Sequence, residues 1–317
     1  MKALYFESFG SSDVLQYGEL PEPVIANKEL LVQMEYIGLN YADIYRRKGN
    51  YHIEKNIPYI NGYEGVGTVV EIGTAVAEYE VGDKVLFVDV PFANAELVAV
   101  PEEKAIRIPK TIDIQLIASV GLQGLTADFL AHDLGLNGKD ENVFVHGISG
   151  GVGQILSQML TADGVKVYGV TSTEEKQQLA LSQGAEMVFL RNSGWEPEYH
   201  SFFDTVYDGV GSTLLESISL VKNRGKVVFF GMAGGNPPAI DFIQLLSQSK
   251  SILTGDLWDY LTSANQRKER SARLFKYFEE EKIVTSPPTI YALKEGKQAH
   301  EHLESGKSIG KILLQPS

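Results

Sequence analysis

The stretch that decides the fold is Val143-Phe144-Val145-His146-Gly147-Ile148-Ser149-Gly150-Gly151-Val152-Gly153-Gln154-Ile155. Its first residues are apolar and β-branched or aromatic, which predicts a buried strand, and the residues from Gly151 onward predict a helix. This order points the unpaired N–H groups of the helix N-terminus at the turn between the two elements. Because a pyrophosphate is the natural ligand of such a turn, the stretch predicts a dinucleotide site.

The glycines of this turn have separate predicted roles. A side chain at Gly150 or Gly151 would hold the phosphates away from the backbone, and Gly153 permits the helix to pack closely on the strand. The spacing is G-x-x-G-G-x-G rather than the strict G-x-G-x-x-G, so the position of the motif between strand and helix carries the prediction. The alternative is a tight turn that needs glycine for its geometry alone.

Strand and helix patterns keep alternating beyond this turn. Strands are predicted at 165–170, 187–189, 205–207, 226–230 and 251–254, and helices at 151–161, 173–183, 213–221 and 242–249. Such alternation indicates a parallel sheet with helices on both faces, the doubly wound arrangement of α/β proteins.

The residues before this region show a different sequence pattern. Alternating segments at 30–37, 65–72, 84–88 and 96–100, separated by Gly, Pro and Asn, predict strands. A long helix at 114–136, capped by Asp113, marks the change. Helices at 265–282 and 298–303 and a strand at 311–314 lack the parallel-sheet rhythm, so we expect the C-terminal segment to return to the first domain. The predicted domains are therefore 1–113 with 259–317, and 114–258.

Length, net charge and cysteine content limit the kinds of partner and chemistry that this protein can have. The 317 residues suggest two domains, and 28 basic against 41 acidic residues give a net charge of −13, which disfavours nucleic acid and anionic membranes as partners. Without cysteine there is no disulfide, Cys-ligated zinc, iron–sulfur cluster or thiol nucleophile. Glu7 interrupts the N-terminal apolar run and no later run reaches the ~18 apolar residues of a membrane span, so we expect a cytoplasmic protein.

The end of the second strand of the doubly wound region indicates which dinucleotide binds. An NAD site usually has a carboxylate there for the ribose 2′-OH, whereas this chain has Thr171-Ser172-Thr173, followed by Lys176 and Arg191. Hydroxyl groups and cations favour the 2′-phosphate of NADPH. The alternative makes Thr173 a helix cap, with Glu174 and Glu175 in the first turn and Lys176 merely solvated.

Motifs along nearly the whole chain resemble those of one family. They are Gly38-Leu39-Asn40-Tyr41-Ala42-Asp43-Ile44-Tyr45 with Gly49-Asn50-Tyr51, Gly62-Tyr63-Glu64-Gly65-Val66-Gly67, Val81-Gly82-Asp83-Lys84-Val85, Gly124-Leu125-Thr126-Ala127, the glycine turn, Tyr207-Asp208-Gly209-Val210-Gly211, and Ala299-His300-Glu301-His302-Leu303-Glu304-Ser305. In order and spacing they resemble the zinc-free medium-chain dehydrogenases/reductases of the quinone oxidoreductase (zeta-crystallin-like) group. The resemblance implies a GroES-like β-rich catalytic domain, an inserted Rossmann domain and a homodimer formed through the Rossmann sheets.

The chain departs from the zinc-dependent relatives at their metal ligands. Those relatives have a His in the segment written here Gly62-Tyr63-Glu64, and cysteines as further ligands. The six histidines, at positions 52, 132, 146, 200, 300 and 302, show no ligand spacing. We therefore predict no metal, and a zinc-independent enzyme.

By resemblance, the catalytic segment runs from Asn40 to Tyr51. Asn40 is expected to position the nicotinamide or the acceptor oxygen, and Tyr45 and Tyr51 to line the acceptor pocket; the alternative is that both tyrosines only pack. The residues expected to bind the cofactor are Thr126, Ser149, Gly150, Gly151, Val152, Ser172, Lys176, Arg191 and Gly231. Thr126 has the alternative of a bond back to its own helix, and Gly231 that of a strand-ending turn. Lys307 and Lys311 are expected either to reach the adenosine phosphates or to be solvated.

Without a metal, the acceptor must itself be electrophilic. A quinone or an α,β-unsaturated carbonyl spreads the charge of an added hydride onto an oxygen that hydrogen bonds can hold. The sequence thus predicts an NADPH-dependent quinone reductase, with a C=C reductase of alkenals or enones, or a non-catalytic NADPH sensor, as alternatives. Asp256, Trp258 and Gln123 stand where the well-known quinone reductases tend to have cationic residues. Of all the properties that the resemblance implies, the quinone as acceptor is therefore the one that these residues support least.

Overall fold

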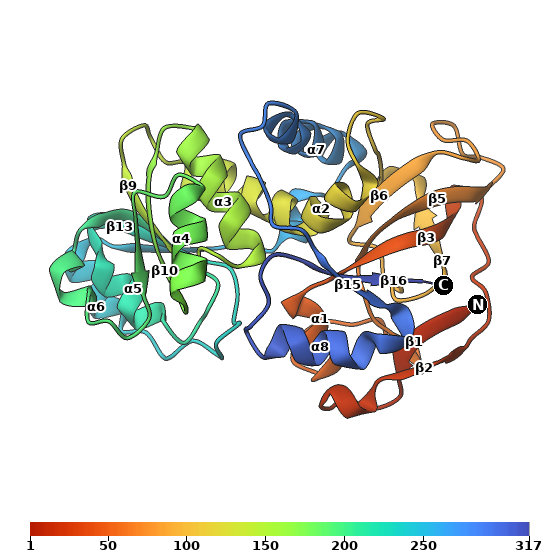
Figure 1. Ribbon diagram of the computed structural model, residues 1–317, viewed down its shortest axis with the longest axis horizontal. Coiled ribbons are helices and arrows are strands. Elements are labelled where there is room, and N and C mark those ends of the chain that lie inside the picture. Colours follow the sequence, from red (N-terminus) through yellow and green to blue (C-terminus); the bar gives the residue numbers. More distant parts are fainter. Residues whose placement is uncertain (317) are drawn as a thin grey trace. The chain divides into compact units, whose positions relative to one another are not determined.

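A computed structural model describes residues 1–316, which form two compact units (Figure 1). The first contains Met1–Leu122, Leu261–Ser271 and the residues from Ser286 onward. The second contains Gln123–Tyr260 and Ala272–Thr285. The sequence boundaries after residues 113 and 258 stay a prediction about domains, and the units are described one by one below.

A six-stranded parallel sheet forms the centre of the second unit. Its strands lie in the order β11-β10-β9-β12-β13-β14. Their bounds are β9 Asn142–His146, β10 Lys166–Thr171, β11 Met187–Leu190, β12 Phe203–Asp208, β13 Val221–Phe229 and β14 Ser251–Thr254. The chain starts in the middle with β9, runs to one edge, and resumes beside β9 with β12. The doubly wound prediction is confirmed, and the order reverses beside the strand that leads into the glycine turn, where such sheets bind ligands.

Helices cover both faces of this sheet. The helices α3 (Gly151–Ala162) and α4 (Glu174–Ser182) follow β9 and β10, whereas α5 (Leu214–Leu220) and α6 (Phe242–Gln248) precede β13 and β14. Right-handed crossovers place the first pair on one face and the second pair on the other, because the two halves of the sheet are built in opposite directions. The side chains of Phe144, Val206 and Val227 are fully buried in the core of this unit.

The predicted helix at 114–136 is two elements. The α-helix α2 covers Ile114–Phe129, and a π-helical turn continues it over Leu130–Gly135. A Cβ atom at Gly135 would lie 1.8 Å from the hydroxyl of Tyr207, so this turn needs glycine for close approach. The combined helix is long and apolar enough to cross a membrane, but 67% of its most apolar window is buried inside the protein, which identifies it as a core helix.

Antiparallel strands dominate the first unit. The main sheet has the order β15-β16-β3-β5-β6-β8, with β7 paired to β3, and a second sheet has the order β2-β1-β4. Their bounds are β1 Lys2–Phe6, β2 Gln16–Glu19, β3 Glu29–Leu39, β4 Tyr59–Ile60, β5 Glu64–Ile72, β6 Lys84–Val88, β7 Leu97–Pro101, β8 Ala105–Arg107, β15 Thr289–Ala292 and β16 Ile312–Gln315. The helices α1 (Tyr41–Arg47) and α8 (Gly296–Glu304) pack on each other. The four strands predicted before residue 100 are confirmed.

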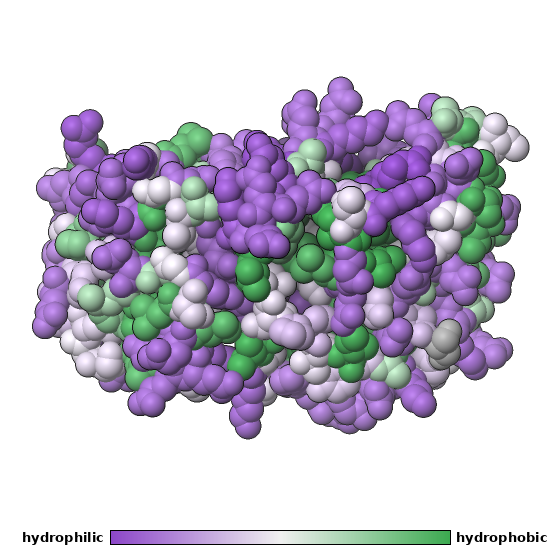
Figure 2. Space-filling model, turned by 45° about the horizontal axis from the view of Figure 1, so that its top comes forward, coloured by the Kyte–Doolittle hydropathy of each residue, from purple (hydrophilic) through white to green (hydrophobic). Residues whose placement is uncertain are grey.

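Polar residues cover most of the face drawn in Figure 2, and apolar side chains form scattered groups on it. Acidic and basic residues, 22% of the sequence, are expected at the surface.

A charged cluster ties the second half of α7 (Ala264–Glu279) to the second unit. Asp128 accepts from Arg273 Nε and Nη2 at 2.5 and 2.6 Å, and His132 Nδ1 lies 3.2 Å from the same carboxylate. His132 Nε2 lies 3.2 Å from Asp163. Burial acts to lower the pKa of His132, but its bonds to the two carboxylates outweigh burial and raise the pKa to about 9. The histidine is therefore charged at neutral pH.

This raised pKa predicts a loss of stability in alkali. Because the folded-state pKa lies above the ordinary 6.5, the stabilisation by His132 is complete below that pH and is lost as the pH rises through 9. The free energy of unfolding in urea of His132→Gln should therefore fall short of the wild type by more at about pH 6 than at about pH 10. Exposed His200→Gln is the control. An equal shortfall at both pH values would contradict the assignment.

Candidate functional site

The glycine turn joins β9 to α3 through a left-handed residue. Gly147 has φ +64°, a conformation that favours glycine, and its carbonyl accepts from Gly150 N at 2.8 Å. A Cβ at Gly153 would lie 2.2 Å from that carbonyl, so helix and turn pack closely, as predicted. A Cβ at Gly150 would meet only this oxygen, at 3.1 Å, and would otherwise stand in open space. The outer side of Gly150 is thus accessible to a ligand.

Gln123 from α2 fills the space beside Gly151. A Cβ at Gly151 would lie 2.3 Å from its Oε1 and 2.4 Å from its Nε2. Glycine at this position therefore also admits a side chain of the protein itself. Sequence reasoning noted Gln123 only as a departure from the relatives. The structure shows that its amide, which can donate and accept hydrogen bonds, lies at the turn.

Hydroxyl groups and cations gather where β10 ends. Ser149 Oγ lies 2.5 Å from Thr171 Oγ1, which joins the glycine turn to this strand end. Thr173 caps α4 by accepting from Lys176 N at 3.3 Å, so the capping part of the alternative is confirmed, but Lys176 is buried rather than solvated. Burial, and next the nearby charge of Arg191, lower the pKa of Lys176, which is only 8% exposed. Two neighbouring cations favour an anion at this end of the sheet.

The other predicted cofactor residues also belong to the second unit. Thr126 is half-buried on α2, Val152 lies in the first turn of α3, and Ser172 is exposed directly after β10. Gly231 follows β13, and a Cβ there would lie 2.9 Å from the Gly209 carbonyl. The ends of β12 and β13 therefore approach each other closely.

A buried network that sequence reasoning missed links two glycine-containing turns. Ser217 Oγ lies 2.7 Å from Asp208 Oδ2 and 3.0 Å from His146 Nε2, and Asp208 Oδ1 accepts from the backbone of Val210 and Gly211. Burial lowers the pKa of His146 to about 4, against the opposing influence of the Asp208 carboxylate. The histidine is therefore neutral. The sequence signal that could have revealed this network is the position of His146 and Asp208 at the ends of two strands that lie side by side in the sheet.

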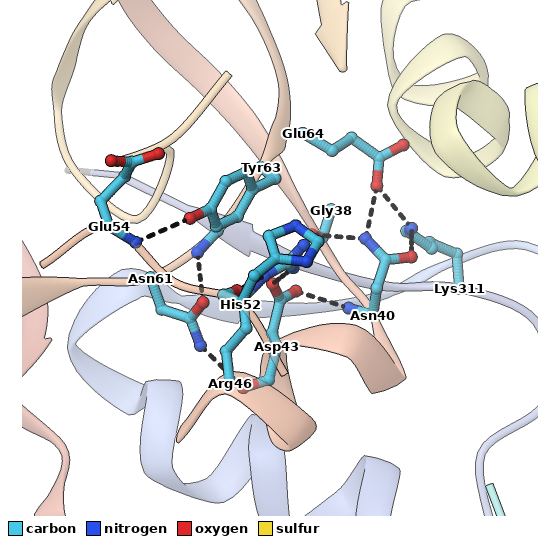
Figure 3. Close-up of polar contacts among 11 residues, drawn as sticks. Gly38, Asn40, Asp43, Arg46, His52, Glu54, Asn61, Tyr63, Glu64 and Lys311 are labelled. Carbon is cyan, nitrogen blue, oxygen red and sulfur yellow. Dashed lines mark hydrogen bonds and ion pairs between the residues drawn. The ribbon is translucent and has the colours of Figure 1, made fainter. Parts of the chain in front are cut away.

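In the first unit, Asn40 is held on every side (Figure 3). It is 7% exposed, and its Nδ2 donates to the Gly38 carbonyl at 3.2 Å and to Glu64 Oε2 at 2.9 Å. Its Oδ1 accepts from Lys311 Nζ at 2.8 Å. Its backbone N–H donates to Asp43 Oδ2 at the start of α1. The amide orientation is therefore fixed, and donation to a ligand would replace one of these bonds.

The expectation for Lys311 is wrong. It is 3% exposed, and its ammonium lies 2.7 Å from Glu64 Oε2, so it is neither solvated nor available to adenosine phosphates. The reason is strand pairing, because Ile312 of β16 lies opposite Leu39 of β3 and so brings Lys311 beside Asn40. Lys307, by contrast, is exposed, as the solvated alternative requires.

The predicted tyrosine pair, Tyr45 and Tyr51, follows Asn40 in the sequence. The rings of Tyr45 and Tyr51 meet edge to face with centroids 6.5 Å apart, and both are half-buried. The guanidinium of Arg46 lies 5.1 Å from the Tyr51 ring and 3.8 Å from the ring of Tyr63. The structure thus brings together aromatic faces and a cation that sequence reasoning had not used.

The donor set does not fit a zinc ion. Tyr63 stands where zinc-dependent relatives have a histidine, and the cation of Arg46 stacked on it would repel a metal. Within residues 1–316, no three His, Asp or Glu side chains are grouped so that they could hold a metal ion.

The buried pair of Glu64 and Lys311 predicts a large effect of a single substitution. Lys311→Met leaves a carboxylate without its cation and should lower the free energy of unfolding by about 3–5 kcal/mol. The double variant Glu64→Gln/Lys311→Met should recover part of this loss, and exposed Lys307→Met should cost almost nothing. Urea unfolding measures all three. A loss below about 1 kcal/mol in Lys311→Met would contradict a tightly buried pair.

Comparison with known proteins places this geometry in a family. Residues 26–110 match the family described as alcohol dehydrogenase GroES-like domain, and residues 151–265 match zinc-binding dehydrogenase. The chain is similar to a probable quinone oxidoreductase of Schizosaccharomyces pombe, with 33% identity over 96% of this chain and 94% of the relative. It is also similar to a 2-haloacrylate reductase of a Burkholderia species, with 29% identity over 88% of each chain.

A solved structure agrees along the whole length. The crystal structure of Escherichia coli quinone oxidoreductase complexed with NADPH superposes with a TM-score of 0.95 at 29% identity and covers all of both chains. The two-domain architecture and the full-length identity identify the group. The chain therefore belongs to the medium-chain dehydrogenase/reductase superfamily, in its quinone oxidoreductase group.

Proposed function

We propose that this protein is a zinc-independent NADPH:quinone oxidoreductase. The observation that carries the proposal is the glycine turn at the switch point of the sheet, open at Gly150 and flanked by the cations Lys176 and Arg191. Its full-length likeness to quinone oxidoreductases supports the acceptor class.

The second unit fits NADPH. The N–H groups of Gly151 and Val152 at the start of α3 would hold the pyrophosphate, with Ser149 and the open side of Gly150 beside them. Ser172, Lys176 and Arg191 would bind the 2′-phosphate, and Thr126 and Gly231 would contact the nicotinamide end. When bound, NADPH supplies the hydride.

The first unit supplies the proposed acceptor wall. Tyr45 and Tyr51 offer aromatic faces to a planar ring and hydroxyl groups to its oxygen atoms. Asn40, fixed by Glu64 and Lys311, sets the start of α1 and hence the position of both tyrosines. A quinone suits this wall because its own electrophilicity replaces the Lewis acid of a metal.

A second candidate is reduction of a C=C bond next to a carbonyl or carboxyl group. The likeness to a 2-haloacrylate reductase favours it. The same binding residues serve both reactions, so the acceptor alone distinguishes them.

We further propose a cytoplasmic homodimer. Phe242, Ile243 and Leu246 on α6 are 72–75% exposed, and β14 is an edge strand of the sheet. Both features suit pairing of two Rossmann sheets.

The 2′-phosphate assignment predicts a change in cofactor preference. Lys176→Ala should weaken NADPH binding about tenfold, with little effect on NADH, because one charge-assisted bond to the phosphate is lost. Fluorescence titration with each cofactor measures this. Lys166→Ala, an exposed lysine at the other end of β10, is the matched control. Equal weakening of both cofactors would remove Lys176 from the phosphate site.

An acceptor screen tests the function itself. NADPH oxidation, followed by absorbance, should be fastest with 1,4-benzoquinone or 9,10-phenanthrenequinone and slower with crotonaldehyde. A preference for crotonaldehyde would favour the C=C reductase. Tight NADPH binding with no oxidation by any acceptor would leave only a non-catalytic sensor.

A further inference from the structure

Arg46 is a buried cation with an unpaired nitrogen. It is 1% exposed, its Nη1 lies 3.1 Å from Asp43 Oδ1, and its Nε donates to the His52 carbonyl at 3.0 Å. Within the part of the chain that the structure describes, Nη2 is shielded from solvent and has no hydrogen-bond acceptor. A buried donor on a charged group is costly without an acceptor, so this atom indicates a ligand.

The orientation of this guanidinium is fixed before any ligand arrives. Asp43 and the His52 carbonyl hold Nη1 and Nε, and the rings of Tyr63 and Tyr51 flank the guanidinium carbon at 3.8 and 5.1 Å. The ring faces stabilise the positive charge, but they give Nη2 no oxygen to bond. Arg46 is thus a preorganised donor in the segment that carries Tyr45 and Tyr51.

The charge balance indicates what kind of oxygen fits. The Asp43 carboxylate already neutralises Arg46, so a permanent anion gains little here. An oxygen that is neutral when it binds and becomes negative during the reaction gains more, because the donor is in place when the charge develops. A quinone carbonyl has this property.

We propose that Arg46 is a catalytic residue whose Nη2 donates to a carbonyl oxygen of the quinone. This rests on the proposed function. When the other carbonyl oxygen of the quinone takes up the hydride that NADPH supplies, one electron pair shifts through the ring to the oxygen at Arg46, which leaves a hydroquinone monoanion. Arg46 stabilises the anionic oxygen until a proton from water completes the hydroquinone.

The route to Nη2 passes through a loop. Tyr51 is half-buried and His52 is exposed, and neither belongs to a helix or strand. Their rings are tilted by 42° to each other, with centroids 4.1 Å apart. Figure 3 shows His52 in front of Arg46. An acceptor reaches Nη2 by displacing the exposed side chain of His52, and it leaves Tyr51 and the core elements in place.

The test uses 4-nitrophenol, whose phenolate mimics the oxygen of a reduced quinone and absorbs at a different wavelength from the phenol. With NADP⁺ present, the wild type should bind the phenolate about tenfold more tightly than the phenol, which lowers the apparent pKa of the bound probe by about one unit. Arg46→Gln should abolish this preference. Lys48→Gln, which removes an exposed cation from the same segment, should retain it.

A second variant guards against misfolding. Arg46→Gln leaves Asp43 buried without its cation, so Asp43→Asn/Arg46→Gln, in which the pair is neutral, is measured beside it. Loss of the phenolate preference in this folded variant supports the proposal. An unchanged preference in either folded variant, or failure of the wild type to bind the probe, overturns it.

Kinetics separates this proposal from the proposed function. With 1,4-benzoquinone, Arg46→Gln should lower kcat about 10²-fold and change KM little, whereas a merely structural arginine would change thermal stability and leave the kcat of the folded fraction intact. A wild type that shifts the probe but reduces no quinone would refute the proposed function and still support the donor at Arg46. Quinone reduction unaffected by Arg46→Gln would refute the donor alone.

Discussion

The first turn of α3 is the constraint on which the rest of this structure depends. A helix leaves its first N–H groups without partners inside the helix, and this one begins directly after a central strand of a parallel sheet. Glycine at 150 leaves the backbone open on the outer side, and glycine at 153 lets the carbonyl of Gly147 approach the helix. Dipole, exposed donors and small residues all favour a diphosphate at this position.

Buried ion pairs likewise fix side chains in the first unit. Glu64 and Lys311 hold Asn40, and Asp43 holds Arg46 beside Tyr51 and Tyr63. Each pair is nearly neutral as a whole, so burial is tolerable, and each fixes one end of the Asn40–Tyr51 segment. The acceptor that we propose, which is electrophilic without a Lewis acid, would bind at this segment.

Periodicity made most of the fold predictable. Runs of apolar residues with period two or 3.6 located the strands of the parallel sheet and its four helices, and the motif order indicated the family. Short strands such as β4 and β8, of two and three residues, carry too few residues to show a period. At the π-helical turn Leu130–Gly135, the hydroxyl of Tyr207 approaches Gly135, a contact that no local pattern reveals.

The site was predictable only in part, because burial depends on distant pairing. Tyr45 and Tyr51 lie together because they are close in sequence. Lys311 meets Asn40 across 271 positions, through the pairing of β16 with β3. The predicted strand at 311–314 does not by itself reveal which strand it pairs with. The surroundings of Gln123 and Arg46 likewise depend on residues that are near them in space rather than in sequence.

The most direct test of the central claim is a crystal structure of the protein with NADPH. A pyrophosphate within hydrogen-bond distance of the backbone N–H groups of Gly151 and Val152, beside the open side of Gly150, is the expected result. A cofactor bound elsewhere, or a turn blocked by the side chain of Gln123, would contradict it.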